Sequence, residues 1–280
     1  MDAPLSPDPA GEWDALPGFL DALYARYHYD FRGYARSSLK RRLRTAMLHG
    51  GERTLEQLQS RVLADAGRFG RLLSFLTVQV SELFRDPPFW LALRTQVLPL
   101  LRTFPSLKIW IAGCSSGEEV WTMAILLKEE GLLSRALLYA TDINAGALAR
   151  AEAGIYGIDR IPGFTSNHQR AGGKAPLSEY YSAAFGHAVF DKSLKRHVVF
   201  ADHSLATDSV FAEVQLVCCR NVLIYFDRPL QDRALGLFRE ALCHNGFLGL
   251  GSKETLRFSA HAAAFEAVAA QERLYQKKRP

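Results

Sequence analysis

Two patterns of apolar residues divide this chain into two parts. Up to about residue 102 the apolar positions recur at helical spacing, with few strand signals and with glycine or proline between segments. This spacing predicts helices near 16–27, 36–49, 54–66, 68–77 and 87–102. We therefore expect a small all-helical N-terminal domain at 16–102, preceded by an acidic, Pro-rich tail at 1–15 that we expect to be mobile.

From Leu107 the pattern changes to strands, glycine turns and helices in alternation. That alternation predicts a parallel sheet within an α/β domain at 103–280. An irregular stretch rich in Gly, Tyr, Ser and Phe indicates an inserted subdomain at about 155–196. Two short alternating runs near the C-terminus suggest final antiparallel strands.

The composition is that of a globular, soluble protein, since 48% of the 280 residues are hydrophobic and 22% are charged. The four cysteines lie inside apolar segments without metal-ligand spacing, so we expect neither a disulfide framework nor a bound metal. No apolar run is long enough for a membrane span, and the N-terminus does not resemble a secretory signal. These features favour a cytoplasmic protein without direct membrane insertion.

The net charge of +5 is unevenly placed along the chain. On the predicted helix at 36–49, Arg36, Lys40 and Arg44 recur every four residues, and Arg41 adds a further positive charge. One interpretation is a solvated face on a helix packed by its leucines. The other is a docking surface for an acidic partner, either protein or nucleic acid.

The turn after the first predicted strand, AGCSSGEE at 112–119, combines small residues with two acids at the start of a helix. Gly113 would let a ligand approach the backbone closely. Glu119 would repel a pyrophosphate, so the turn favours a ligand with a cationic group over a dinucleotide. An ordinary capped turn between strand and helix explains the same acids.

Asp142 ends the second predicted strand, where an acid commonly accepts hydrogen bonds from ribose hydroxyls. The alternative is an Asp that only caps the following helix. Taken together, the two turns predict a ribose and a nearby cation, and S-adenosylmethionine carries both.

The run QLVCCRNVLIYF at 215–226 is apolar throughout before it reaches polar residues, which is typical of a central strand. Arg220, Asn221 and Tyr225 would emerge at its carboxyl edge, where open α/β sheets place their chemistry. The alternative is that they cap the strand and fill a core position. A further polar cluster at 76–87 is, by composition, either a linker or part of a site.

Taken together, these segments resemble the chemotaxis receptor methyltransferase family, CheR, from roughly Gly33 to the C-terminus. Five motifs occur in the family's order: FRDP at 84–87, AGCSSGEE at 112–119, ATDI at 140–143, CRNVLIYF at 219–226 and GLGSKETL at 249–256. The resemblance implies a helical domain followed by a Rossmann-like class I methyltransferase domain with a small antiparallel subdomain. It also implies S-adenosylmethionine-dependent O-methylation of glutamyl side chains, with S-adenosylhomocysteine as the other product.

The resemblance also implies roles for individual residues. Glu119 would bind the methionine amino group, Asp142 the ribose, and Gly113 would lie against the cofactor. Arg85 and Tyr225 would be catalytic. The remaining cofactor-binding positions would be Gln79, Ser81, Ser204, Leu205, Arg220 and Asn221, with Arg85 counted there as well.

Three of these positions depart from the family's usual residues. Gln79 occurs where the family usually has Asn, Ser81 where it has Thr, and Ser204 where it has Asn. Ser204 lacks an amide, which weakens one contact by about 1 kcal/mol. The expected partner is an acidic helical protein, the cytoplasmic region of a chemoreceptor or a similar signalling protein, and no nucleic acid is expected. The alternatives are a non-catalytic adaptor that binds the cofactor or its product, and a nucleic-acid methyltransferase.

Overall fold

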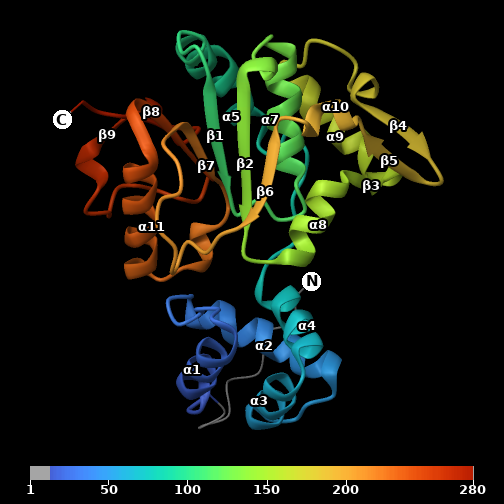
Figure 1. The fold of residues 1–280 in the computed structure, drawn as a ribbon, viewed down its shortest axis with the longest axis vertical. Coiled ribbons are helices and arrows are strands. Elements are labelled where there is room, and N and C mark those ends of the chain that lie inside the picture. The colour runs from blue at the N-terminus through green and yellow to red at the C-terminus, as the bar shows by residue number, and fades with distance from the viewer. Residues whose placement is uncertain (1–12, 280) are drawn as a thin grey trace. The chain divides into compact units, whose positions relative to one another are not determined.

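The structure, a computed structural model, describes residues 13–279 and is drawn in Figure 1. The chain divides into two compact units, Met1–Val78 and Gln79–Pro280. This division falls earlier than the predicted boundary at 102. The segment 79–102 belongs to the second unit because Phe89, Trp90 and Leu101 share one hydrophobic core with the strands of the sheet.

The first unit is helical, as predicted. Its described helices are α1 (Leu16–Tyr27), α2 (Arg36–Gly50), α3 (Leu55–Ala64) and α4 (Ala66–Leu76). The Thr54 side chain accepts a hydrogen bond from the Gln57 backbone N–H at the start of α3, and Asp65 caps α4 in the same way. Gly51 ends α2 with φ +70°, a conformation that costs glycine little.

Most of the predicted mobile tail, residues 1–12, lies outside the described residues. Trp13 is described, and it is only 8% exposed. The Lys40 ammonium and the Arg44 guanidinium lie 5.8 Å and 5.2 Å from the centre of its ring. The expectation of mobility is therefore wrong for Trp13, because its indole is packed against α2.

In the second unit, three helical segments come first: α5 (Pro87–Ala92), a π-helical segment η1 (Leu93–Val97) and α6 (Leu98–Leu101). Seven strands follow in one sheet of order β6-β2-β1-β7-β8-β10-β9. They are β1 (Leu107–Ala112), β2 (Ala136–Asp142), β6 (Val198–Asp202), β7 (Val214–Cys219), β8 (Leu242–Leu250), β9 (Phe265–Ala269) and β10 (Leu274–Lys277).

The sheet is mixed. The pairs β1–β2, β2–β6, β1–β7 and β7–β8 are parallel, and β10 runs antiparallel to both of its neighbours. The prediction of a parallel sheet completed by antiparallel C-terminal strands is therefore confirmed. The strand order reverses between β1 and β7, and in open α/β sheets ligands bind beside such a point.

Helices cover both faces of the sheet. Ile109 and Ile111 of β1 lie in the core that includes residues of α7 (Glu118–Glu129). Trp110, between them, faces the other way and packs edge-on against Phe238 of α11 (Arg228–Ala241). Successive strand residues point to opposite faces, so this alternation places α7 and α11 on opposite sides of β1 (Figure 1).

An inserted subdomain follows α8 (Ala145–Ala153) and contains its own three-stranded antiparallel sheet of order β3-β5-β4. Its elements are β3 (Ile155–Gly157), α9 (Ile161–Arg170), β4 (Tyr181–Ala184), β5 (His187–Phe190) and α10 (Lys192–Lys195). Figure 1 shows this small sheet set apart from the large one. The resemblance had implied such a subdomain.

Short 3-10 turns complete the described part: η2 (Leu133–Arg135), η3 (Ile158–Arg160), η4 (Leu177–Tyr180), η5 (Leu223–Tyr225) and η6 (Ala262–Ala264). Within residues 13–279, no helix combines the length and the apolar character that crossing a membrane requires.

Candidate functional site

The candidate site begins at the turn after β1. The backbone N–H groups of Gly113 and Cys114 both donate to the Thr141 carbonyl at the end of β2, at 2.8 Å and 2.9 Å. Gly113 has φ +72°, and a Cβ at this position would lie 2.5 Å from a methyl group of Val222. Both the positive φ and the Val222 side chain favour glycine at this position, and the expectation that a ligand also approaches Gly113 stays a prediction.

Glu119 lies in the first turn of α7, beside this turn. Its Oε2 accepts a hydrogen bond from Arg220 Nη1 at 3.1 Å, and its side chain is 14% exposed. Its other oxygen, Oε1, has no hydrogen-bond partner among the described residues. Burial raises the pKa of the Glu119 carboxyl, although the Arg220 charge acts in the opposite direction. Glu119 thus offers a half-satisfied, poorly hydrated carboxylate.

Arg220, at the end of β7, is enclosed by protein, with 1% of its side chain exposed. Its Nη2 lies 2.8 Å from Asp86 Oδ2 and donates to the Arg85 carbonyl at 3.1 Å. The guanidinium carbon lies 4.1 Å from the centre of the Phe89 ring. The two terminal nitrogens of Arg220 thus hold Glu119, Asp86 and the Arg85 carbonyl, whereas its buried Nε has no hydrogen-bond partner among the described residues. The expectation that Arg220 lies near the reacting end of the cofactor stays a prediction.

Asp142 ends β2 with both carboxylate oxygens engaged. Oδ2 accepts from the Ser115 N–H at 2.8 Å, and Oδ1 accepts from the Asn144 N–H at 2.9 Å. Burial raises the pKa of Asp142, and these two hydrogen bonds oppose the rise. Each oxygen retains a second lone pair, so Asp142 can still accept hydrogen bonds from ribose hydroxyls.

Asp202 is a residue that the sequence reasoning missed. It ends β6 directly opposite Asp142 in the register of the parallel pair. Partial burial raises the pKa of Asp202, and the nearby Asp208 carboxylate adds to this effect. The sequence did contain a signal for Asp202: like Asp142, it is an acid at the end of a predicted strand.

The loop after β7 is held by Glu254, which was also missed. Its carboxylate accepts hydrogen bonds from the N–H groups of Asn221 (3.1 Å), Val222 (2.8 Å) and Gly251 (2.6 Å). Asn221 adopts φ +61°, a left-handed conformation that asparagine tolerates better than most residues. Glu254 belongs to the GLGSKETL motif. The sequence analysis identified this motif but not the role of Glu254 in holding the loop.

The segment 79–86 contributes Gln79, Ser81 and Arg85. Gln79 Oε1 accepts from Arg150 Nη2 of α8 at 2.7 Å. The Ser81 carbonyl accepts a hydrogen bond from Arg160 of the inserted subdomain, and Arg160 also donates to the buried Glu118 carboxylate at 2.8 Å. Arg160 therefore ties the insert to two parts of the candidate site, a role that the sequence reasoning missed.

The Arg85 side chain is half-buried, and its charge acts to lower the pKa of Glu119. Its guanidinium makes no hydrogen bond or ion pair with any residue that the structure describes. The structure thus brings Arg85, Glu119 and Arg220 together, and it leaves the Arg85 cation available to a ligand.

The remaining predicted residues lie on two loops. The Ser204 N–H donates to Asp208 Oδ2 at 2.8 Å, and Leu205 beside it is buried. Both follow β6, the strand next to the one that Asp142 ends. Tyr225 is partly exposed in the turn η5, on the same loop as Asn221.

The chemistry of these groups fits S-adenosylmethionine. The unshared oxygen of Glu119 suits an ammonium group, and the lone pairs of Asp142 suit ribose hydroxyls. The acids in the first turn of α7 disfavour a pyrophosphate at the same place.

Comparison with family models agrees with this fit. The model described as "CheR methyltransferase, SAM binding domain" matches residues 79–274, and the model described as "CheR methyltransferase, all-alpha domain" matches residues 14–77. The two matches meet where the two compact units divide.

Several curated proteins are similar over most of the chain. "Putative methyltransferase Cher3" of Pseudomonas putida is 56% identical, over 92% of this chain and 94% of that protein. The "Chemotaxis protein methyltransferase" of Listeria monocytogenes is 28% identical, over 81% of this chain and 84% of that protein. "Chemotaxis protein methyltransferase 1" of Vibrio cholerae is 30% identical, over 65% of this chain and 66% of that protein.

Among solved structures, the N-methyltransferase NodS from Bradyrhizobium japonicum, in complex with S-adenosylhomocysteine, has a TM-score of 0.40 to this chain. The sequences are 15% identical, and the match covers 71% of this chain and 90% of NodS. The assignment of the family rests on the family models and the curated relatives.

Proposed function

Because this chain belongs to the CheR methyltransferase family and is an S-adenosylmethionine-dependent methyltransferase, we propose that it methylates glutamyl side chains of a chemoreceptor or chemoreceptor-like protein. The observation that carries the proposal is the Glu119 carboxylate beside the strand-order reversal. Arg220 takes one of its oxygens, and the other is left for a cationic ligand. The names of the Listeria and Vibrio relatives support a chemotaxis substrate.

In this proposal Glu119 holds the amino group of the cofactor, and Asp142 holds its ribose. Arg220 and Asp86 keep the Glu119 side chain in place, since all three are joined by direct contacts. S-adenosylmethionine supplies an electrophilic methyl group bound to a sulfonium. Transfer of that methyl group to the carboxylate converts the sulfonium into a neutral thioether.

The substrate needs no general base. A glutamate side chain in water has a pKa of about 4.3, so it is already ionised at neutral pH. What the chain must supply is orientation and exclusion of water. Arg85 is suited to steer the incoming carboxylate because its guanidinium is not paired with another described residue. Tyr225 would position the carboxylate or the methyl group.

We also propose that α2 docks the acidic substrate. Arg36 and Arg41 are exposed on this helix, while Lys40 and Arg44 are partly exposed beside Trp13. Leu39, Leu43 and Met47 are buried on a neighbouring face of the helix. A basic face of this kind attracts acidic helices, so association should weaken as ionic strength rises.

The cofactor is tested by calorimetric titration with S-adenosylhomocysteine, S-adenosylmethionine and NAD, with Asp142→Ala as the comparison. We expect the first two to bind, NAD not to bind, and the variant to lose most of the affinity. Binding of NAD in place of the other two would contradict the assignment.

The reaction is tested with methyl-labelled S-adenosylmethionine and a chemoreceptor cytoplasmic fragment. A glutamyl methyl ester releases labelled methanol in base, whereas an N-methyl group does not. Arg85→Ala should lower kcat/KM by about 100-fold or more, which is about 2.7 kcal/mol. The control is Arg239→Ala, an exposed arginine on α11. Activity of Arg85→Ala equal to wild type would remove Arg85 from the mechanism, and cofactor binding without any transfer would favour the adaptor.

A further inference from the structure

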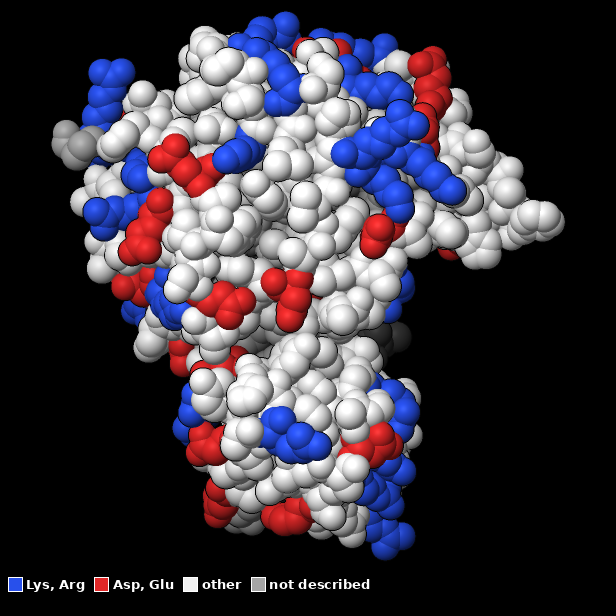
Figure 2. Space-filling model, viewed as in Figure 1, with Lys and Arg blue, Asp and Glu red and all other residues white. Residues whose placement is uncertain are grey.

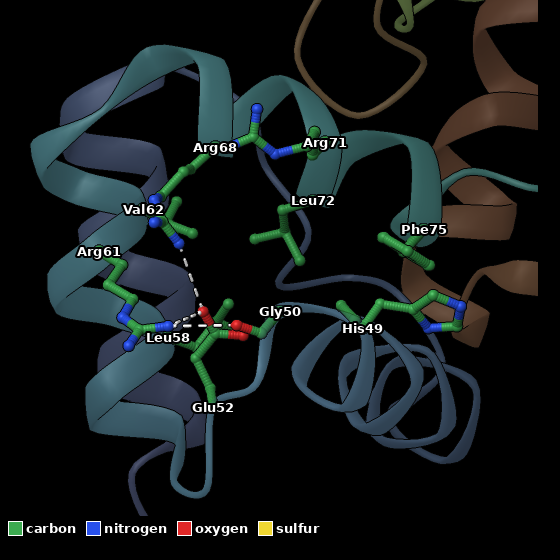
Figure 3. A pocket seen from close by; sticks show the side chains of 11 residues that line it. His49, Gly50, Glu52, Leu58, Arg61, Val62, Arg68, Arg71, Leu72 and Phe75 are labelled. Atoms are coloured by element: carbon green, nitrogen blue, oxygen red, sulfur yellow. Dashed lines mark hydrogen bonds and ion pairs between the residues drawn. The ribbon is translucent and has the colours of Figure 1, made fainter.

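The helical unit contains a small cavity that the proposed function does not use. It has a volume of about 180 Å³ and lies between the end of α2 and the helices α3 and α4 (Figure 3). Every residue that lines it comes from the range 46–75, so the cavity is complete within this unit. Its apolar lining includes Leu58, Val62, Leu72 and Phe75.

One wall of this cavity carries a buried carboxylate that is only partly satisfied. The Glu52 side chain is 3% exposed, and its Oε1 accepts from Arg61 Nη1 at 2.8 Å. Its Oε2 is buried and has no hydrogen-bond partner among residues 13–279. Leaving a buried acceptor without a donor costs about 1–3 kcal/mol, so a ligand that donates to Oε2 recovers that cost.

Gly50 provides the space for this oxygen. A Cβ at position 50 would lie 1.9 Å from Glu52 Oε2, so any other residue would displace the carboxylate. Figure 3 shows Glu52, Arg61 and Arg68 around the same opening.

Besides the His49 imidazole, the other polar side chains at the cavity are arginines. Arg61, Arg68 and Arg71 line it, and they face the single negative charge of Glu52. Arg68 lies 3.6 Å from Glu52 and 3.8 Å from the exposed Asp65. Arg71 is exposed and pairs with no acid among the described residues. Figure 2 shows basic side chains gathered along one side of this unit. The unpaired Arg71 makes the opening suited to an anion.

From these features we propose that the cavity binds a small organic anion that consists of one ring, an acidic group and a hydrogen-bond donor. The ring would lie against the apolar lining, since an apolar cavity of about 150 Å³ already accepts benzene. The acidic group would pair with Arg71, and the donor would reach Glu52 Oε2. The site is independent of the proposed methyl transfer.

Three probes of one size separate these features. The ligand 4-hydroxybenzoate has ring, anion and donor, benzoate lacks the donor, and 4-hydroxybenzyl alcohol lacks the anion. Titration of the full chain should give a Kd on the order of 1 mM or tighter for 4-hydroxybenzoate. Each of the other two should bind about tenfold more weakly.

The variant Arg71→Gln should weaken 4-hydroxybenzoate binding by about tenfold, since this exposed side chain supports no contact that folding needs. The matched control is Arg53→Gln, an exposed arginine that does not line the cavity, and it should leave the Kd unchanged. Saturating S-adenosylhomocysteine should also leave the Kd unchanged.

Three results would overturn the proposal: no saturable binding of 4-hydroxybenzoate at about 10 mM, equal affinity in Arg71→Gln and wild type, or displacement by S-adenosylhomocysteine. The last result would place the probe at the methyltransferase site.

Discussion

The two ends of helix α7 carry buried glutamates with opposite character. Glu119, at the N-terminal end, binds Arg220 through one oxygen, and its other oxygen has no hydrogen-bond partner among the described residues. Glu129, at the C-terminal end, has 1% of its side chain exposed and is saturated with donors. Its partners are Arg94 at 2.6 Å, His168 at 2.9 Å, the Lys174 N–H at 3.0 Å and the Tyr180 hydroxyl at 3.2 Å.

The two pKa values shift in opposite directions. Burial raises the pKa of both carboxyls. At Glu129 the hydrogen bonds from His168 and Arg94 outweigh burial and bring the pKa down to about 2. At Glu119 burial outweighs the hydrogen-bonded Arg220 and the weaker effect of the Arg85 charge, so the pKa stays above its usual value. Glu129 therefore joins the inserted subdomain to α7, whereas the shortage of partners at Glu119 is consistent with the cofactor-binding role that we propose for it.

The largest expected effect is a loss of stability when Glu129, at the C-terminal end of α7, is substituted. Glu129→Gln removes one of the two carboxylates that pair with the buried Arg94, since Glu130 remains at 2.6 Å, and it weakens the charged hydrogen bonds to Glu129. It should destabilise the protein by about 2–3 kcal/mol. Urea unfolding measures this loss. The affinity for S-adenosylhomocysteine should remain within about twofold of wild type, and a large loss of affinity would show that the two ends are not separate.

The corresponding substitution at the N-terminal end of α7, Glu119→Gln, should weaken cofactor binding. Glu119→Gln should weaken S-adenosylhomocysteine about 30-fold, because a hydrogen bond to a charged group contributes about 1.5–3 kcal/mol. Its unfolding free energy should stay within about 1 kcal/mol of wild type, since the raised pKa means that the fold does not favour the ionised form. Titration calorimetry and urea unfolding of one preparation test both statements. Unchanged affinity would remove Glu119 from the cofactor site.

The pH dependence sharpens the comparison further. The folded pKa of Glu129, about 2, lies below its ordinary value of 4.5, so its contribution to stability is full above that value and is lost as the pH falls toward 2. The stability difference between wild type and Glu129→Gln should therefore narrow below about pH 4.5. Unfolding curves at about pH 7 and about pH 3.5 measure it. A stability difference between wild type and Glu129→Gln that increases at low pH would contradict the lowered pKa of Glu129.

The smallest expected effect comes from one of the several donors to Glu129. Tyr180→Phe removes the 3.2 Å hydrogen bond but leaves Arg94 and His168 in place, so it should cost about 1 kcal/mol in urea unfolding. A loss as large as that of Glu129→Gln would mean that the donors do not share the stabilisation.

Some predictions from sequence failed where packing decided the outcome. The boundary at 102 was wrong because helical spacing at 87–102 does not reveal which core a helix joins, and Phe89 and Trp90 join the core of the sheet. The close approach of Val222, on another strand's loop, to Gly113 gave no signal in the sequence. Glu254 and Arg160 gave no local signal of what they hold.

The sequence by itself determined the helices of residues 16–102, the alternation of strands and helices from Leu107, the α/β class and the acids at the turns. Those features depend on spacing between neighbouring residues, which periodicity and turn residues record. Only the tertiary structure decided that one oxygen of Glu119 lacks a hydrogen-bond partner among the described residues, while both oxygens of Glu129 have one. The partner of Glu119 is 101 positions away along the chain, and the donors to Glu129 come from η1 and the inserted subdomain. Partner number and burial set the pKa of a carboxylate, and both arise only when distant segments pack together.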